Sequence, residues 1–109
     1  MIQRGSVVVV ALPGAYGKAR PAVVVQADRG DDLRSRIVCP MTSTVVADRH
    51  HFRPIVHPSA QNGLREVSQI MVDKPHVLHL DKLGDAIGML EATTMAEVGL
   101  ALALLLGLA

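Results

Sequence analysis

Short apolar runs, separated by glycine, proline and polar residues, follow one another along most of this chain. Residues 7–12 and 21–27 are rich in β-branched side chains, and each run has the length of a single strand. A third strand is predicted at residues 36–41, where Pro40 marks an edge or an exit from the sheet. Shorter strands are expected at residues 52–58 (an edge strand), 64–72, 77–80 and 86–90, and Asn62-Gly63 signals a turn.

The end of the chain predicts a helix. Thr94 and Glu97 match a capping box, in which a hydroxyl and a carboxylate satisfy free N–H groups of the first turn. The helix is expected to run to about Leu106, with Gly107 ending it. Beyond Glu97 its surface is apolar almost all round, so it must be buried against the sheet or a partner. Many short strands with one terminal helix indicate a mainly β (α+β) fold, a single domain over residues 1–109 with a strongly bent sheet or barrel.

Composition narrows the functions open to the chain. Tyr16 and Phe52 are its only aromatic residues, which argues against stacking several bases on aromatic rings. Its 11 basic and 10 acidic residues argue against binding through bulk charge and leave room for a local basic patch. The single Cys39 excludes an internal disulfide and fits a reducing cytoplasm. No leader-like segment precedes the first strand, and residues 98–109 are about half as long as a membrane span, so we expect a cytoplasmic protein without a membrane partner.

Arg20 is the first candidate for chemistry, because it lies between a glycine-rich loop and an apolar strand. Pro21 fixes its own φ and biases Arg20 towards an extended backbone, which holds the guanidinium at the mouth of the loop. The five N–H donors of the guanidinium form a planar fork that suits a phosphate. The alternative is an ordinary surface arginine that pairs with an aspartate or caps a loop carbonyl.

Polar residues near the predicted strand ends are the other candidates. Hydroxyls such as those of residues 42–44 usually bond the local backbone, but beside Arg20 one of them could hold a phosphoryl oxygen. Asp73 is either a turn former before a proline or a carboxylate that orients an arginine. Tyr16 and Lys18 flank Arg20 on its loop and could hold a single-stranded nucleic-acid backbone.

The five histidines do not predict a metal site. His76 and His79 lie three positions apart on an extended segment, so their side chains face opposite ways. One cysteine supplies no ligand pair at zinc-finger spacing. No phosphate-binding glycine loop and no serine-nucleophile motif stands out. The sequence therefore predicts neither a metal nor a cofactor.

Several short motifs, taken in order, form a larger pattern. Arg20-Pro21-Ala22-Val23-Val24 is followed at a fairly specific distance by Pro40-Met41-Thr42-Ser43, although either piece alone would be weak. Further segments extend the pattern over nearly the whole chain: Arg4-Gly5-Ser6-Val7-Val8, Asn62-Gly63-Leu64-Arg65, Ser68-Gln69-Ile70-Met71-Val72-Asp73-Lys74 and Leu106-Gly107-Leu108. In this order the motifs resemble the MazF/PemK family of type II toxin–antitoxin toxins.

The resemblance implies a compact SH3-like β-barrel of the CcdB/MazF type with a C-terminal helix, working as a homodimer. It implies a metal-independent, sequence-specific endoribonuclease that cleaves single-stranded RNA through attack by the RNA's own 2′-hydroxyl. It also implies a cognate antitoxin, whose acidic, partly disordered C-terminal tail folds as it binds the dimer and blocks the RNA groove.

The resemblance also implies site residues. The family's motif arginine falls on Arg20 and its motif threonine on Thr42, which would hold the scissile phosphate. The predicted RNA contacts are Tyr16, Lys18, Ser43, Asp73 and Lys74. A reaction with an internal nucleophile mainly needs the phosphate aligned and its growing charge stabilised. Some members carry an arginine where this chain has Met71, so that role is absent or has moved to Arg65 or Lys74.

Other functions stay open at this point. A CcdB-like gyrase-poisoning toxin would share the fold but bind a protein target, and it needs no pairing of Arg-Pro with Thr-Ser. A non-catalytic SH3-like interaction module usually binds through exposed aromatic residues, of which this chain has two. A catalytically degenerate family member is the further alternative, because Met71 replaces an arginine.

Overall fold

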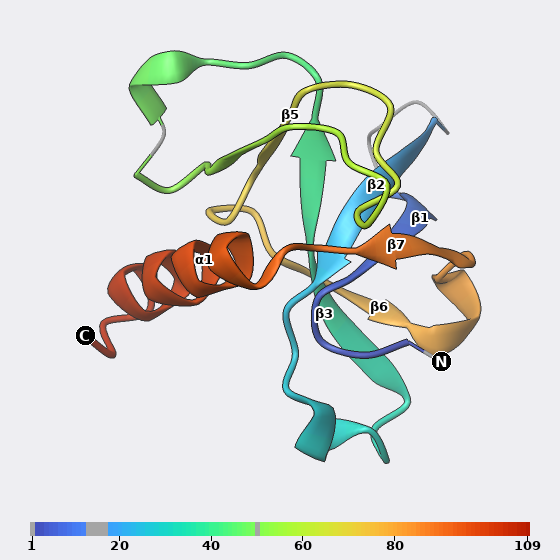
Figure 1. The fold of residues 1–109 in the computed structure, drawn as a ribbon. Coiled ribbons are helices and arrows are strands. Elements are labelled where there is room, and N and C mark those ends of the chain that lie inside the picture. Colours follow the sequence, from blue (N-terminus) through green and yellow to red (C-terminus); the bar gives the residue numbers. More distant parts are fainter. Residues whose placement is uncertain (1, 13–17, 50) are drawn as a thin grey trace.

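A computed structural model describes residues 2–12, 18–49 and 51–109 of the chain (Figure 1). The strands in these ranges are β1 (Ser6–Ala11), β2 (Ala19–Val24), β3 (Ser35–Thr42), β4 (Ile55–Val56), β5 (Ser68–Ile70), β6 (His76–His79) and β7 (Ala86–Met89). A single α-helix of the described residues, α1 (Ala92–Leu105), follows them. Short 3₁₀ turns at Asp28–Gly30, Ala47–Arg49 and Leu80–Lys82 connect some of the strands.

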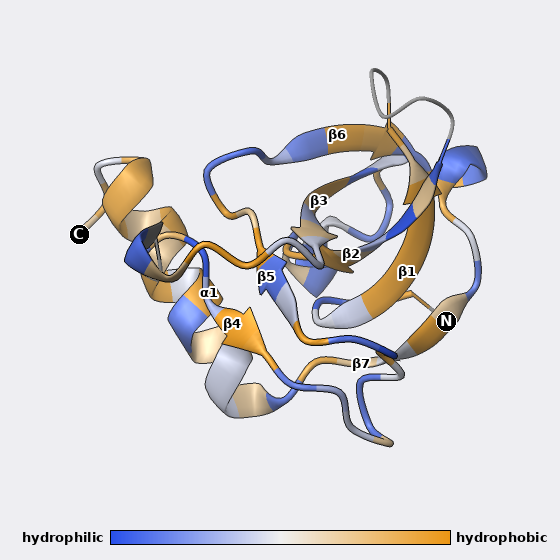
Figure 2. Ribbon diagram, turned by 90° about the horizontal axis from the view of Figure 1, so that it is seen from above, coloured by the Kyte–Doolittle hydropathy of each residue, from blue (hydrophilic) through white to orange (hydrophobic). Residues whose placement is uncertain are grey.

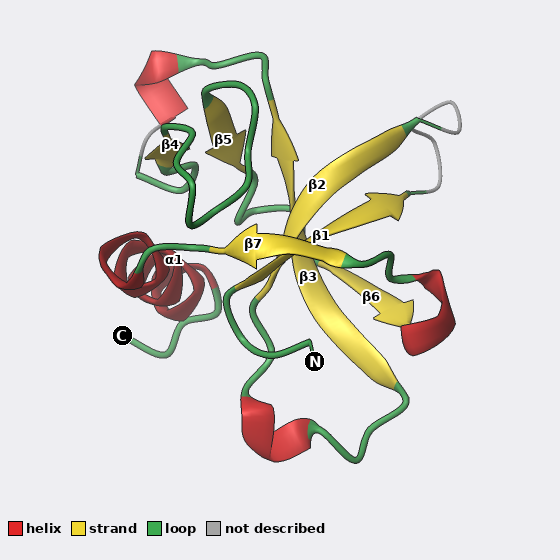
Figure 3. Cartoon of the chain, turned by 45° about the vertical axis from the view of Figure 1, so that its right-hand side comes forward, coloured by secondary structure: helices red, strands yellow, loops and turns green. Residues whose placement is uncertain are grey.

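The strands form one antiparallel sheet that curls on itself, in the order β4-β5-β3-β2-β1-β7 (Figure 3). β3 is its hub, because different parts of this long strand pair with β6, β2 and β5. Its pairing with β2 ends at Pro40, opposite Ala22, and the next residue, Met41, already pairs with Ile70 of β5. The predicted fold, a strongly bent sheet with a C-terminal helix, is confirmed, and Pro40 does mark an exit from one pairing.

Both faces of β1 are buried, which explains its apolar run, orange in Figure 2. Val7 and Val23 belong to a cluster that includes Val98 of α1. The neighbouring Val8 and Val24 point the opposite way into a second cluster. Because adjacent side chains of a strand face opposite sides, a strand with two covered faces must be apolar at every position.

The helix begins earlier than the capping box predicted. Its N-cap is Glu91, and Thr94 lies inside the first turn, so the prediction of a Thr94–Glu97 capping box was wrong. The side chain of Glu91 makes no capping bond, because its carboxylate accepts hydrogen bonds from Ser59 and Asn62 instead. Tertiary contacts thus decide where the helix starts.

The end of the helix is as predicted. Gly107 has a φ of 73°, and its N–H donates to the carbonyl of Leu104 at 3.3 Å. The N–H of Leu108 donates to the carbonyl of Ala103 at 2.7 Å. These two bonds form a Schellman motif, in which glycine takes the left-handed conformation without strain.

Only one side of α1 is covered by the sheet. Val98 and Ala101 are buried, whereas Leu100 is 60% and Leu104 50% exposed. The chain by itself therefore leaves much of the apolar helix surface unburied. The sequence predicted burial of this surface against the sheet or a partner, and the sheet covers only part of it. No helix in the described ranges is both long and apolar enough to cross a membrane.

Two predicted strands were too long. The range 64–72 is a strand only at Ser68–Ile70, and 52–58 only at Ile55–Val56, which does lie at the edge of the sheet. Residues 64–67 are irregular because their polar groups bond elsewhere: the N–H of Leu64 donates to the side chain of Asn62, and the carbonyl of Glu66 accepts from Ser68 Oγ. This irregular segment becomes one wall of the site.

Candidate functional site

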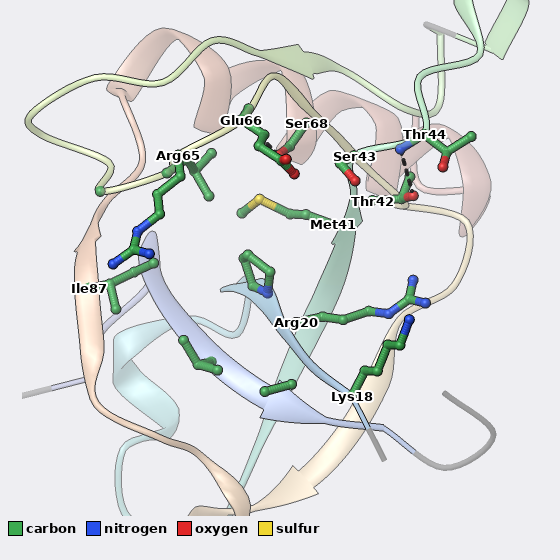
Figure 4. A pocket seen from close by; sticks show the side chains of 15 residues that line it. Lys18, Arg20, Met41, Thr42, Ser43, Thr44, Arg65, Glu66, Ser68 and Ile87 are labelled. Carbon is green, nitrogen blue, oxygen red and sulfur yellow. Dashed lines mark hydrogen bonds between the residues drawn. The ribbon is translucent and has the colours of Figure 1, made fainter. Parts of the chain in front are cut away.

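A pocket with a volume of about 710 Å³ opens where β2 and β3 separate (Figure 4). β2 continues beside β1, with Arg20 opposite Val10, while β3 turns away to pair with β5. Pro21 and Pro40 have no N–H group, so neither can donate to a longer β2–β3 ladder. The space between the diverging strands is lined by residues of both.

One end of the pocket is cationic and rich in hydroxyls. Arg20 and Lys18 come from β2 and the residue before it, and Thr42, Ser43 and Thr44 from the end of β3 (Figure 4). The β2–β3 register, continued by two positions beyond its last pair, places Arg20 opposite Thr42. The motif arginine and the motif threonine therefore line the same pocket from two diverging strands.

Arg20 and Thr42 are both free to bind an anion. Arg20 is half-buried and makes no hydrogen bond or ion pair with the described part of the chain. The Oγ1 of Thr42 accepts a hydrogen bond from the N–H of Thr44 at 3.1 Å. Since this oxygen donates to no acceptor in the described residues, the hydroxyl proton is available for a phosphoryl oxygen.

The opposite wall is formed by the irregular segment 64–67 with Ser68 and Ile87. Arg65 and Glu66 are exposed to the pocket, and the carboxylate of Glu66 points towards its interior (Figure 4). Between the two walls the floor is apolar, with Val9, Pro21 and the nearly buried Met41.

The wall is held by Asn62, a fully buried amide. Its Oδ1 accepts from the N–H groups of Ser59 and Leu64, and its Nδ2 donates to the carbonyl of His57 and the carboxylate of Glu91, all at 3.0 Å. These bonds use the whole hydrogen-bonding capacity of the amide. The Ser59 hydroxyl, and then the Asn62 amide, hold the pKa of Glu91 below its usual value.

Glycines allow the turn at Asn62-Gly63 to lie directly against β7. Gly63 has a φ of 71°, and a Cβ there would come within 2.2 Å of the carbonyl oxygen of Ile87. A Cβ on Gly88 would come within 2.4 Å of the backbone of Asn62. The predicted Asn-Gly turn is confirmed, with the N–H of Gly63 bonded to the carbonyl of Ser59.

The predicted site residues divide into two groups. Arg20, Thr42, Ser43 and Lys18 line the pocket, whereas Asp73 and Lys74 do not. Tyr16 lies outside the described residues.

Asp73 has a structural partner. Its carboxylate accepts from Arg53 Nε at 2.9 Å and from Arg53 Nη2 at 3.0 Å, and Arg53 is only 8% exposed. The hydrogen bond from Arg53 holds the pKa of Asp73 below its usual value. Asp73 is therefore the carboxylate that orients an arginine, and its predicted RNA contact has no support from the pocket.

The segment 64–68 also contains what the sequence prediction missed. Of the two candidates to replace the arginine absent at Met71, Arg65 lines the pocket and Lys74 does not. Glu66 and Ser68 were not singled out, because the range was treated as a regular strand. The positive φ expected of an Asn-Gly turn was the available signal that the chain changes direction before Leu64.

Within the described ranges no group of three or more His, Cys, Asp or Glu residues could hold a metal ion. His76 Nδ1 lies 2.8 Å from the carbonyl of Lys74, and His79 Nδ1 accepts from the N–H of Asp81 at 3.2 Å. Glu66 is the one carboxylate of the described pocket lining. Metal-independent chemistry stays a prediction.

The chain is thus a small curled antiparallel sheet with a terminal helix, and its pocket combines an arginine with several hydroxyls. Residues 3–106 match the family described as "PemK-like, MazF-like toxin of type II toxin-antitoxin system", and the chain belongs to this family. A relative from Mycolicibacterium smegmatis (strain ATCC 700084 / mc(2)155), named "Probable endoribonuclease MazF", is 36% identical over an alignment of 109 positions that covers 99% of this chain and 99% of that one.

Solved structures show the same fold. The Mycobacterium tuberculosis toxin MazF-mt6 superimposes with a TM-score of 0.79 at 25% identity, covering 95% of this chain and 98% of that one. A mycobacterial endoribonuclease in complex with its cognate antitoxin superimposes with a TM-score of 0.84 at 24% identity, covering 100% and 98%. MazF from Deinococcus radiodurans gives 0.78 at 22% identity, covering 96% of both chains.

Proposed function

We propose that this toxin is a single-domain endoribonuclease that cleaves single-stranded RNA in the pocket of Arg20. One observation carries the proposal: Arg20 and Thr42 line the same pocket, where the β2–β3 ladder ends. The guanidinium of Arg20 has no partner in the described chain, and the hydroxyl of Thr42 has a free proton. The family assignment, and the name of the relative at 36% identity, support a nuclease over the gyrase-directed and interaction-module alternatives.

In the proposed reaction the ribose 2′-oxygen forms a bond to phosphorus while the bond from phosphorus to the 5′-oxygen breaks. The 2′-hydroxyl loses its proton and the leaving oxygen gains one, giving a 2′,3′-cyclic phosphate and a 5′-hydroxyl. Arg20 donates to the non-bridging oxygens, and Thr42 adds its O–H, so both stabilise charge that grows in the transition state. A guanidinium hardly deprotonates, which makes charge stabilisation rather than proton transfer the role of Arg20.

The exposed side of α1 supports a homodimer. Leu100, Ala101 and Leu104 line an apolar groove of about 480 Å³ together with Phe52 and Pro54. An apolar patch of this kind on a small protein is normally covered by a partner. We propose a second copy of this chain as that partner.

A cognate antitoxin is the second proposed partner, because the family consists of the toxins of toxin–antitoxin systems. One structurally similar mycobacterial endoribonuclease was solved with its cognate antitoxin. An acidic segment would be attracted to the end of the pocket that contains Arg20 and Lys18. Since RNA is the proposed substrate, the cytoplasm is the proposed location.

The test is cleavage of a mixed-sequence single-stranded RNA in excess EDTA by the wild type, by Arg20→Ala and by the control Arg29→Ala. Arg29 is an exposed arginine that does not line the pocket. The wild type and the control should yield fragments with 5′-hydroxyl ends, and Arg20→Ala should be slower by roughly 100-fold or more, as for the loss of one anion-binding donor. Intact RNA after incubation with folded wild type would overturn the proposal.

A further inference from the structure

The volume of the pocket is larger than the binding of a phosphate requires. Arg20 and Lys18 line one side of a volume of about 710 Å³, and Glu66 lines another, near Ser68 and Ser43 (Figure 4). A carboxylate repels a phosphate, whereas the neighbouring Arg65 attracts one. The carboxylate of Glu66 therefore suits another part of the nucleotide than the phosphate.

The floor between the two ends suits a base. Met41 is 2% exposed and lies beside Pro21 in the pocket lining, and Leu64 closes the side at 7% exposed. No aromatic ring is among the described residues that line the pocket. The partly exposed Val9 and Pro21 give this floor an apolar surface on which a base can lie without an aromatic partner.

Glu66 lines the pocket with a carboxylate that has no partner among the described residues. Its carboxylate makes no hydrogen bond or ion pair within the described chain, and in Figure 4 the neighbouring Arg65 points away from it, towards Ile87. Its backbone is fixed, because Ser68 Oγ donates to the Glu66 carbonyl at 2.9 Å. The preceding Leu64 is tied to the buried Asn62. The backbone that carries Glu66 is therefore fixed before a ligand binds, while its exposed carboxylate is available to a ligand.

We propose that Glu66 is a specificity residue that selects guanine at a nucleotide next to the cleaved phosphate. The inference rests on the proposed ribonuclease function. An ionised carboxylate has two acceptor oxygens and no donor. The Watson–Crick edge of guanine presents two adjacent donors, the N1–H and the 2-amino group, which match those oxygens. Adenine and cytosine present one donor beside an acceptor, and uracil presents one donor between two acceptors.

The size of the effect follows from this match. A good bidentate pair between a side chain and a base discriminates by roughly tenfold to a hundredfold against a wrong base. Single-stranded RNA exposes its Watson–Crick edges to such readout, because the bases are not paired. The wild type should therefore cut faster by about that factor when guanine occupies the selected position.

The experiment sequences the 5′ ends of products from a randomised single-stranded RNA, under single-turnover conditions. The wild type is compared with Glu66→Gln and with Asp32→Asn, an exposed acidic control that does not line the pocket. We expect guanine enrichment at one position for the wild type and the control. Glu66→Gln should cut with a flattened preference, or with one shifted towards adenine, because an amide offers one acceptor and one donor.

A change in the substrate checks the same contact without changing the protein. Inosine lacks the 2-amino group of guanine, so placing it at the selected position should slow the wild type roughly tenfold and leave Glu66→Gln nearly unaffected. Wild type that cuts without guanine enrichment, or Glu66→Gln that keeps the wild-type pattern and the inosine penalty, overturns this inference alone. Wild type that leaves RNA intact overturns the proposed function and the inference with it.

Discussion

Replacing Asn62 tests how the wall of the pocket is built. This side chain is 0% exposed, and it makes four hydrogen bonds, to Ser59, Leu64, His57 and Glu91. Alanine at this position would remove all of them and leave the N–H of the buried Leu64 without its acceptor. The turn that leads into the segment 64–67 would lose its internal support.

The expected cost follows from these bonds. A typical net hydrogen bond contributes about 1 kcal/mol, and the groups on exposed Ser59 and His57 regain water when the amide is removed. We expect Asn62→Ala to lower the free energy of unfolding by about 3 kcal/mol, a large part of the stability of a small domain. Urea unfolding at pH 7 measures it directly.

Asn62→Asp adds a pH test, because it keeps the two acceptors and places a second carboxylate beside Glu91. Repulsion raises the folded-state pKa of such a pair above the unfolded value, so the variant regains stability as the pH falls. In the wild type the pKa of Glu91 is lowered, mainly by the Ser59 hydroxyl, so its contribution is lost as the pH falls below about 4.5. The gap between the two proteins should therefore narrow from pH 7 to pH 4.

Glu91→Gln is the second variant of this experiment, because Glu91 is the residue that the new carboxylate would face. In the double variant with Asn62→Asp, the new amide can donate to the new carboxylate, so the two changes together should cost less than their sum. Asn62→Ala within about 1 kcal/mol of wild type would refute the idea that this amide holds the wall. An Asn62→Asp deficit that does not change between pH 7 and pH 4 would refute the contact with Glu91.

Four further predictions concern the site and its surroundings. Asp73→Asn should lower the free energy of unfolding by about 1.5 kcal/mol, a value reduced because the carboxylate is partly exposed to solvent. RNA cleavage should stay near wild type. Melting curves test the stability, and cleavage assays test the activity. Thr42→Val should slow cleavage roughly tenfold to a hundredfold in single-turnover assays, because one hydroxyl donor to the phosphate is lost. Cys39 should not react with a thiol reagent at pH 8 until urea unfolds the chain, because burial, helped by the charge of Asp73, raises the pKa of its thiol to about 12. Leu104→Glu should shift the protein from dimer to monomer in sedimentation experiments, because the side chain lies in the apolar groove of α1.

The parts of the fold that the sequence predicted well are those with local causes. The apolar runs of β1 and β2 need no knowledge of partners, because β-branched residues on both faces suit a buried strand. Gly107 ends the helix through its own left-handed conformation. Arg20 could be placed at a strand end because Pro21 restricts it, and the resemblance to a family motif predicted Thr42, which lines the same pocket.

The errors have distant causes. Thr94 and Glu97 form a valid local capping pattern, but Glu91 is bonded to a turn about thirty residues earlier in the chain, and the helix starts there. Asp73 looks like any acidic residue at a strand end until Arg53, twenty positions away, is known to bind it. Glu66 reaches the pocket only because Asn62 redirects the backbone. None of these pairings leaves a pattern in a single sequence.

The position of the pocket follows from the way β3 changes partners. Two strands that pair along their whole length leave no space between them for a substrate. Here the ladder between β2 and β3 stops at Pro40, and β3 continues with β5. The side chains next to this point, Arg20 and Thr42, keep the rigidity of their strands but lose the neighbouring strand that would cover them. In the proposed reaction, these two groups could bind the phosphate without rearrangement, which is what a reaction with an internal nucleophile requires of its catalyst.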